Sequence, residues 1–131
     1  MSSATPLFVQ APNGRHGLGI NREKWLPNPA CTSPLFLDMY RVVGILMGVS
    51  LRSKASLSLD LPPFVWKKIL DETVDVEDLE AVDKLCIQAL EELKKIEETA
   101  FGDVFMENFC TPLSNGVVVE LKPNGKNTPV T

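Results

Sequence analysis

The sequence predicts a mostly helical α+β fold with one or two small antiparallel β-hairpins. Apolar residues recur every three or four positions through much of residues 34–96, which is typical of amphipathic helices. Proline and acidic residues stand where such helices would begin. Beyond residue 101, short apolar runs flank turn sequences, which is typical of hairpins. A chain of 131 residues fits one domain, or a large part of one, with a modest core.

The composition excludes several classes of partner. A net charge of -4 lacks the basic excess that nucleic-acid binding requires, so we expect no nucleic acid. Three cysteines without a C-x-x-C pair, and an N-terminus without a signal peptide pattern, predict a reducing cytoplasmic or nuclear location. The richest apolar run, residues 35–49, contains Asp38 and Arg41 and is too short to cross a bilayer, so we expect no membrane partner.

Residues 1–34 predict an irregular, Pro/Gly-rich lead-in with at most short extended pieces such as L-F-V-Q. The folded part is expected over residues 35–131. Its first helix, P-L-F-L-D-M-Y-R-V-V-G-I-L-M-G-V-S-L, is apolar on nearly every face and is therefore expected to be buried on most sides. Gly44 and Gly48 lie four residues apart in it and predict the close approach of another backbone.

The stretch D-L-P-P-F-V-W-K-K-I-L predicts a second helix that its prolines begin, because proline is tolerated in a first helical turn. Asp60 is placed to serve the same helix end, and Lys67 and Lys68 are expected to face water. Asp75 and Asp78 then predict a capping box. It opens a helix whose apolar positions are Val82, Cys86, Ala89, Leu90, Leu93 and Ile96.

The last thirty residues predict strands and turns. F-M-E-N-F-C and V-V-V-E-L-K are strand candidates around a turn at Asn115 and Gly116, and P-N-G at 123–125 predicts a second turn. Cys110 closes the first of these strands.

The sequence offers little that points to chemistry. His16, in a glycine-rich stretch, is interpreted as a solvated loop residue, and no metal ligands or cofactor-binding residues are predicted. Cys86 and Cys110 are interpreted as small buried hydrophobes. Cys31, in L-P-N-P-A-C-T, is the one thiol expected to be exposed, but nothing near it in the sequence lowers its pKa, so an inert thiol is favoured.

Four ordered blocks together resemble the N-terminal lobe of HECT-type ubiquitin-protein ligases. They are M-Y-R-V-V-G-I-L-M-G, L-D-L-P-P-F-V-W-K-K-I-L, D-V-E-D-L-E-A-V-D and V-E-L-K-P-N-G-K-N-T-P-V-T. The stretch G-V-S-L-R-S-K and Trp66 resemble the large HERC-like branch. The family's cysteine motif, L-P-x-A-x-T-C, is similar to L-P-N-P-A-C-T, but it belongs to a later lobe, so this likeness is interpreted as coincidental.

The resemblance implies part of a domain that accepts ubiquitin from a conjugating enzyme onto a cysteine and passes it to a substrate lysine. Residues 35–131 would be a partial N-lobe without the conjugating-enzyme-docking subdomain or the catalytic C-lobe. The chain alone is therefore expected to be inactive, with no catalytic residue, while its parent would be a transferase. Arg52 aligns with an aromatic member of the ubiquitin-binding patch that some HECT N-lobes carry, which makes it a candidate contact.

Two alternatives stay open at this point. The chain could be a truncated, noncatalytic binding or regulatory module derived from such a ligase, or an unrelated helical adaptor. The protein substrate, the conjugating enzyme and the chain type cannot be read from these residues.

Overall fold

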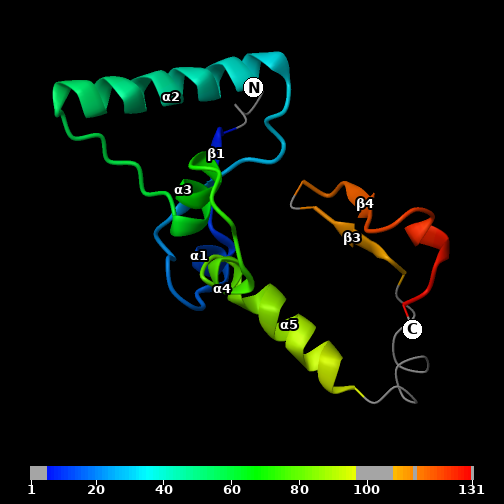
Figure 1. Cartoon of the computed structure of the whole chain (residues 1–131). Helices are drawn as coiled ribbons and strands as arrows, with labels where there is room; N and C mark the ends of the chain where they lie inside the picture. Colours follow the sequence, from blue (N-terminus) through cyan, green and yellow to red (C-terminus); the bar gives the residue numbers. More distant parts are fainter. Residues whose placement is uncertain (1–5, 97–107, 114, 131) are drawn as a thin grey trace, which may run out of the picture. The chain divides into compact units, whose positions relative to one another are not determined.

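The structure is a computed structural model that describes residues 6–96, 108–113 and 115–130 (Figure 1). It divides into two compact units, Met1–Gln88 and Ala89–Thr131. The elements in chain order are β1 (Phe8–Gln10), α1 (Pro12–His16), β2 (Trp25–Pro27), α2 (Pro34–Ser53), α3 (Pro63–Ile69), α4 (Val76–Glu80), α5 (Lys84–Lys95), β3 (Cys110–Pro112), β4 (Val118–Glu120) and the 3-10 helix η1 (Gly125–Asn127). The predicted mostly helical α+β class with small antiparallel sheets is confirmed.

The N-terminal segment holds more regular structure than its prolines suggested. The expected extended piece is present as β1, which pairs antiparallel with β2 in the register Val9 to Leu26. The short helix α1 lies between them and was not predicted. Pro12 stands at its first turn, where the missing N–H has no intrahelical partner, so this proline begins a helix rather than breaking one. The helix ends at His16, and Gly17 caps it with a φ of 67°, which suits glycine.

One buried asparagine ties this segment to a distant part of the first unit. Asn13 is 1% exposed, and its amide nitrogen donates to the carbonyl oxygens of Ile20 at 3.0 Å and Ala81 at 3.1 Å. Its Oδ1 accepts a hydrogen bond from the amide of Lys84 at 2.7 Å. Asn13 therefore binds the backbone between α4 and α5, where the chain leaves one helix and begins the next.

The single helix expected to run on from the Asp75 cap is wrong, because the chain breaks between α4 and α5. The capping box itself is confirmed: Asp75 accepts from the Asp78 amide at 2.9 Å, and Asp78 accepts from the Asp75 amide at 3.1 Å. The break allows a second helix start, at which Asp83 Oδ1 accepts from the Cys86 amide at 3.2 Å.

The prolines before α3 act as expected, but Asp60 does not. Pro62 is the N-cap residue and Pro63 the first helical residue. The carbonyl of Asp60 instead accepts a hydrogen bond from the amide of Trp25 at 2.8 Å, which joins this strand-like segment to β2. Asp60 is thus used for tertiary pairing rather than for capping.

Lys67 is not a purely solvated residue, which corrects the expectation that it faces water. Its Nζ lies 2.6 Å from Asp78 Oδ2, and the two side chains are 32% and 11% exposed. The hydrogen bond raises the pKa of Lys67 and lowers the pKa of Asp78. The pair holds α3 against α4, while Lys68 is exposed as predicted.

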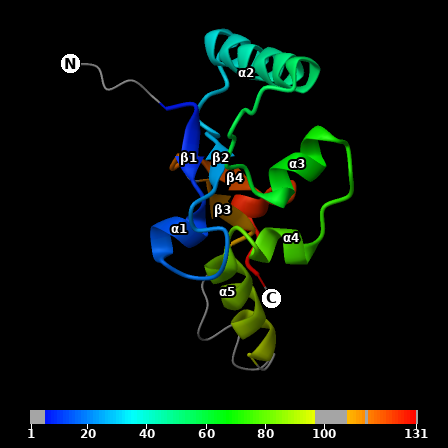
Figure 2. The same ribbon diagram turned by 90° about the vertical axis from the view of Figure 1, so that its left-hand side faces the viewer.

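Helix α2 is formed as predicted but is not buried. None of its residues is buried, and an added Cβ at Gly44 or Gly48 would meet nothing within 4 Å, so the expected close packing at these glycines is wrong in the part of the chain that is described. Figure 2 shows α2 at one end of the first unit, with α3 beneath it. Its outer surface is open to solvent.

The length argument against a membrane is also wrong. α2 has 20 residues, enough by length and composition to cross a bilayer, although core helices of soluble proteins pass the same test. Its charges include Asp38 and Arg41, which pair at 3.3 Å. The absence of a membrane partner stays a prediction.

The second unit contains the predicted hairpin. β3 and β4 pair antiparallel, and Asn115 Oδ1 accepts from the Val117 amide at 3.0 Å beside Gly116, whose φ is 81°. Cys110 begins β3 rather than closing a strand, and residues 105–107 of the first strand candidate lie outside the described residues.

The turn at residues 123–125 forms for a reason other than the one predicted. Asn124 supplies the positive φ of 60°. Gly125 is required because a Cβ there would overlap the carbonyl oxygen of Phe109. A close backbone approach, not an unusual dihedral angle, selects this glycine.

Candidate functional site

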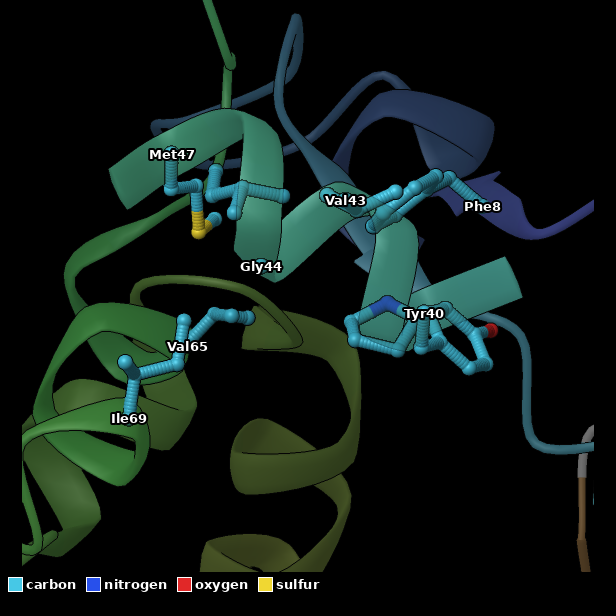
Figure 3. Close-up of a pocket in the computed structure, with 9 residues that line it drawn as sticks. Phe8, Tyr40, Val43, Gly44, Met47, Val65 and Ile69 are labelled. Atoms are coloured by element: carbon cyan, nitrogen blue, oxygen red, sulfur yellow. The ribbon is translucent and has the colours of Figure 1, made fainter. Parts of the chain in front are cut away.

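An apolar cleft lies in the first unit between α2, the β1–β2 sheet and α3 (Figure 3). Its volume is about 330 Å³. The lining residues are Phe8, Pro27, Tyr40, Val43, Gly44, Met47, Leu61, Val65 and Ile69. Only Val65 and Leu61 among them belong to the buried core, which also includes Ala11, Cys31, Val82 and Ile87 among the described residues.

Tyr40 holds α2 to the sheet at the mouth of this cleft. Its hydroxyl donates to the carbonyl of Leu7 and accepts from the amide of Asn28 at 3.0 Å. Its ring meets Phe8 edge to face, with 5.8 Å between centroids. Burial raises the pKa of Tyr40 above its ordinary value, so the phenol stays protonated near neutral pH. Tyr40 is therefore an anchor rather than an acid or base.

The cleft has the chemistry of a packing surface. Aliphatic and aromatic side chains line it. Its one ionisable group is the hydroxyl of Tyr40, which donates a hydrogen bond to the backbone. A smaller apolar hollow of about 160 Å³ shares Met47 and lies against Leu57, Leu59 and Trp66. Neither can hold a charge or transfer a proton, but both can accommodate apolar groups.

The cysteines are placed differently from their predictions. Cys31 is 3% exposed, and its thiol donates to the carbonyl of Pro6 at 3.4 Å, so the expectation of an exposed thiol is wrong. Cys86 is exposed because Ile87 takes the inward position on α5, so its prediction as a buried residue is also wrong. Partial burial, and then the charge of Asp83, raise the pKa of Cys86 and disfavour the thiolate. Cys110 is half-buried.

The remaining candidates stay isolated. His16 is exposed as expected, but it is the last residue of α1 rather than a loop residue. Arg52 lies exposed in the last turn of α2, and its ubiquitin-contact role stays a prediction. Within residues 6–96, 108–113 and 115–130, no three His, Cys, Asp or Glu side chains gather where they could hold a metal ion. Sequence reasoning missed the cleft and the Tyr40 anchor; the one available signal was a polar hydroxyl within an otherwise apolar helix.

Comparison with known proteins gives the class of this fold. A family model described as HECT-domain (ubiquitin-transferase) matches residues 3–131. The chain belongs to this family and forms a portion of a HECT domain. The resemblance seen in the sequence blocks is thereby confirmed.

Individual relatives place it near the HERC-like branch. The chain is 35% identical over 128 residues to the mouse (Mus musculus) E3 ubiquitin-protein ligase HERC2 and 34% identical to the human one, which covers 97% of this chain in each case. It is 24% identical over 129 residues, 98% of its length, to the human protein described as probable E3 ubiquitin-protein ligase HECTD4. It spans about 3% of the length of each of these relatives.

Proposed function

We propose that this chain is the scaffold part of a HECT N-lobe and takes part in ubiquitin transfer without carrying the catalytic cysteine. The family match over residues 3–131 supports the assignment to a ubiquitin ligase. In such transfer, ubiquitin moves from a conjugating enzyme to a ligase thiolate and then to a substrate lysine. The scaffold role is supported by an apolar cleft with no free ionisable group.

The three thiols support the noncatalytic part of the proposal. A nucleophilic cysteine needs solvent access and a lowered pKa. Cys31 lacks access, and the pKa of Cys86 is raised. Cys110 is half-buried at the start of β3. None of the three thiols is therefore in an environment that favours attack on a ubiquitin thioester.

A charging assay tests this proposal. The 131-residue chain is mixed with activating enzyme, conjugating enzyme and ubiquitin, beside a complete HECT ligase as the positive control. We expect a thiol-sensitive ubiquitin adduct on the control and none on this chain. A reducible adduct that disappears in Cys31→Ala, Cys86→Ala or Cys110→Ala would overturn the proposal.

The proposed partners are ubiquitin and a ubiquitin-conjugating enzyme, and the proposed location is the cytoplasm or nucleus. Arg52 is the residue proposed to contact ubiquitin noncovalently, because it is exposed at the end of α2. Titration of labelled ubiquitin with the chain checks this contact. We expect Arg52→Ala to reduce the chemical-shift changes, whereas Arg15→Ala, an exposed arginine on α1, should leave them unchanged. Equal shifts with both variants would exclude Arg52.

A further inference from the structure

The face of α2 opposite the cleft carries a regular stripe of exposed residues. Asp38, Ile45 and Arg52 are spaced by seven residues, close to two helical turns, so they lie on one line along the helix. Ile45 is 58% exposed, and Val42 and Val49 beside this line are each 54% exposed. Because Val43, Gly44 and Met47 face the cleft, this outer stripe remains uncovered after the first unit has folded.

The outer stripe is complementary to itself when reversed. In an antiparallel pair of α2 helices with the two-fold axis at Ile45, Asp38 of one copy lies opposite Arg52 of the other, and this pairing occurs twice. The same register sets Val42 opposite Gly48, where the structure leaves open space that a side chain could fill. A parallel pair would instead set Asp38 against Asp38, which is repulsive.

We propose that two copies of this chain associate through antiparallel pairing of the outer stripe of α2. Apolar contacts around Ile45 and Val42 provide most of the affinity, as at paired helices with a seven-residue repeat. The end charges select the orientation rather than supply the bulk of the binding energy, because they are exposed. Asp38 can keep its own Arg41 at 3.3 Å while it also accepts from the Arg52 of the second copy.

The charges favour a second copy over a lipid bilayer as the occupant. Asp38 and Arg41 lie in the N-terminal half of α2 and would enter the hydrocarbon if the helix crossed a membrane, which is unfavourable for charged side chains. In the antiparallel protein pair, Asp38 instead meets the opposite charge of Arg52 at each end of the contact. The association would also cover Arg52, so it would compete with the ubiquitin contact proposed for that residue.

Charge reversal tests the register. Sedimentation velocity of the full chain over a wide concentration range should show a monomer–dimer equilibrium. We expect Asp38→Arg and Arg52→Asp each to weaken the dimer at least about tenfold, and the double variant to recover to within about threefold of the starting chain. Lys68→Asp, which makes the same charge change as Arg52→Asp but on α3, should leave the dimer unchanged.

A second variant tests the apolar centre. Ile45→Asp sets two carboxylates together at the two-fold axis and should abolish the dimer, whereas Val76→Asp, at an equally exposed valine that begins α4, should not. Circular dichroism establishes that each variant keeps its helices. A chain that stays monomeric, single charge reversals without effect, assembly beyond the dimer, or partition of the chain into phosphatidylcholine vesicles instead of self-association would each overturn the proposal.

Discussion

Among the side chains in the described part of the first unit, Asn13 forms the largest number of hydrogen bonds to backbone groups that are distant in sequence. Its side-chain amide binds backbone groups of Ile20, Ala81 and Lys84, and the last two residues are about 70 positions from Asn13 in the sequence. The sequence P-N-G around it reads as a local turn, so no local pattern could have revealed this role. The α1 and β2 elements were missed for the same reason, since tertiary hydrogen bonds hold them.

Replacement of Asn13 should be costly. Asn13→Ala removes the side-chain donor that binds the carbonyls of Ile20 and Ala81 and the acceptor that binds the Lys84 amide. We therefore expect a loss of about 3 kcal/mol in the free energy of unfolding. Urea titration measures this loss, and hydrogen exchange should show faster exchange of the Lys84 amide. Asn127→Ala, which removes one exposed hydrogen bond to Asn124 at 2.7 Å, should cost less than about 0.5 kcal/mol. Equal effects of the two variants would contradict this account of Asn13.

The Lys67–Asp78 pair predicts a defined pH dependence. The pKa of Asp78 is lowered from 3.8, so its contribution to stability is present above that value and is lost as the pH falls through the folded pKa. The pKa of Lys67 is raised from 10.5, so its contribution is present below 10.5 and is lost as the pH rises through the folded pKa. The pair should therefore stabilise the fold equally across the neutral range.

The difference in unfolding free energy between the starting chain and Asp78→Asn measures this effect. We expect a constant difference between about pH 5 and 9 that shrinks at both extremes. Glu91→Gln, an exposed glutamate on α5, should follow the pH profile of the starting chain. A difference that grows as the pH falls below 4 would show that the sign of the Asp78 shift is wrong.

At the scale of elements, the sequence predicted the helices better than their surroundings. The limits of α2 and the proline start of α3 follow from local patterns, and so does the Asn115–Gly116 turn. The exposure of α2 does not follow, because an all-apolar helix is ordinarily covered. The break between α4 and α5 escaped prediction because the apolar spacing continues across it, while Asp83 and Asn13 begin the new helix.

Two glycines should respond in opposite directions to alanine. Gly44→Ala adds a Cβ into open space in a helix interior, so it should raise the free energy of unfolding by up to about 1 kcal/mol through helix propensity. Gly125→Ala should lower it, since the Cβ would overlap the carbonyl oxygen of Phe109. Urea titration with circular dichroism measures both. A destabilising Gly44→Ala would restore the close packing that the sequence first suggested.

At the scale of the whole molecule, the family could be predicted from the sequence because the resemblance rests on ordered sequence blocks. The extent of the buried core could not be predicted in this way. Few apolar side chains are buried among the described residues, while those of α2 remain in contact with water. Burial arises from contacts between segments far apart in sequence, and local periodicity does not report whether the partner of an apolar face is present.

This shallow core predicts a small heat-capacity change on unfolding. Globular proteins average about 12–15 cal/mol/K per residue, or roughly 1.6–2.0 kcal/mol/K for a chain of this length. Because the change grows with the apolar area that unfolding exposes, the apolar surface of α2 that is already hydrated should contribute little. Calorimetry of Ile45→Asp, in which the proposed dimer is absent, should give a value clearly below that range and a broad transition. A sharp transition with a heat-capacity change inside the range would mean that α2 is packed in solution, and this would contradict the exposure of its apolar side chains.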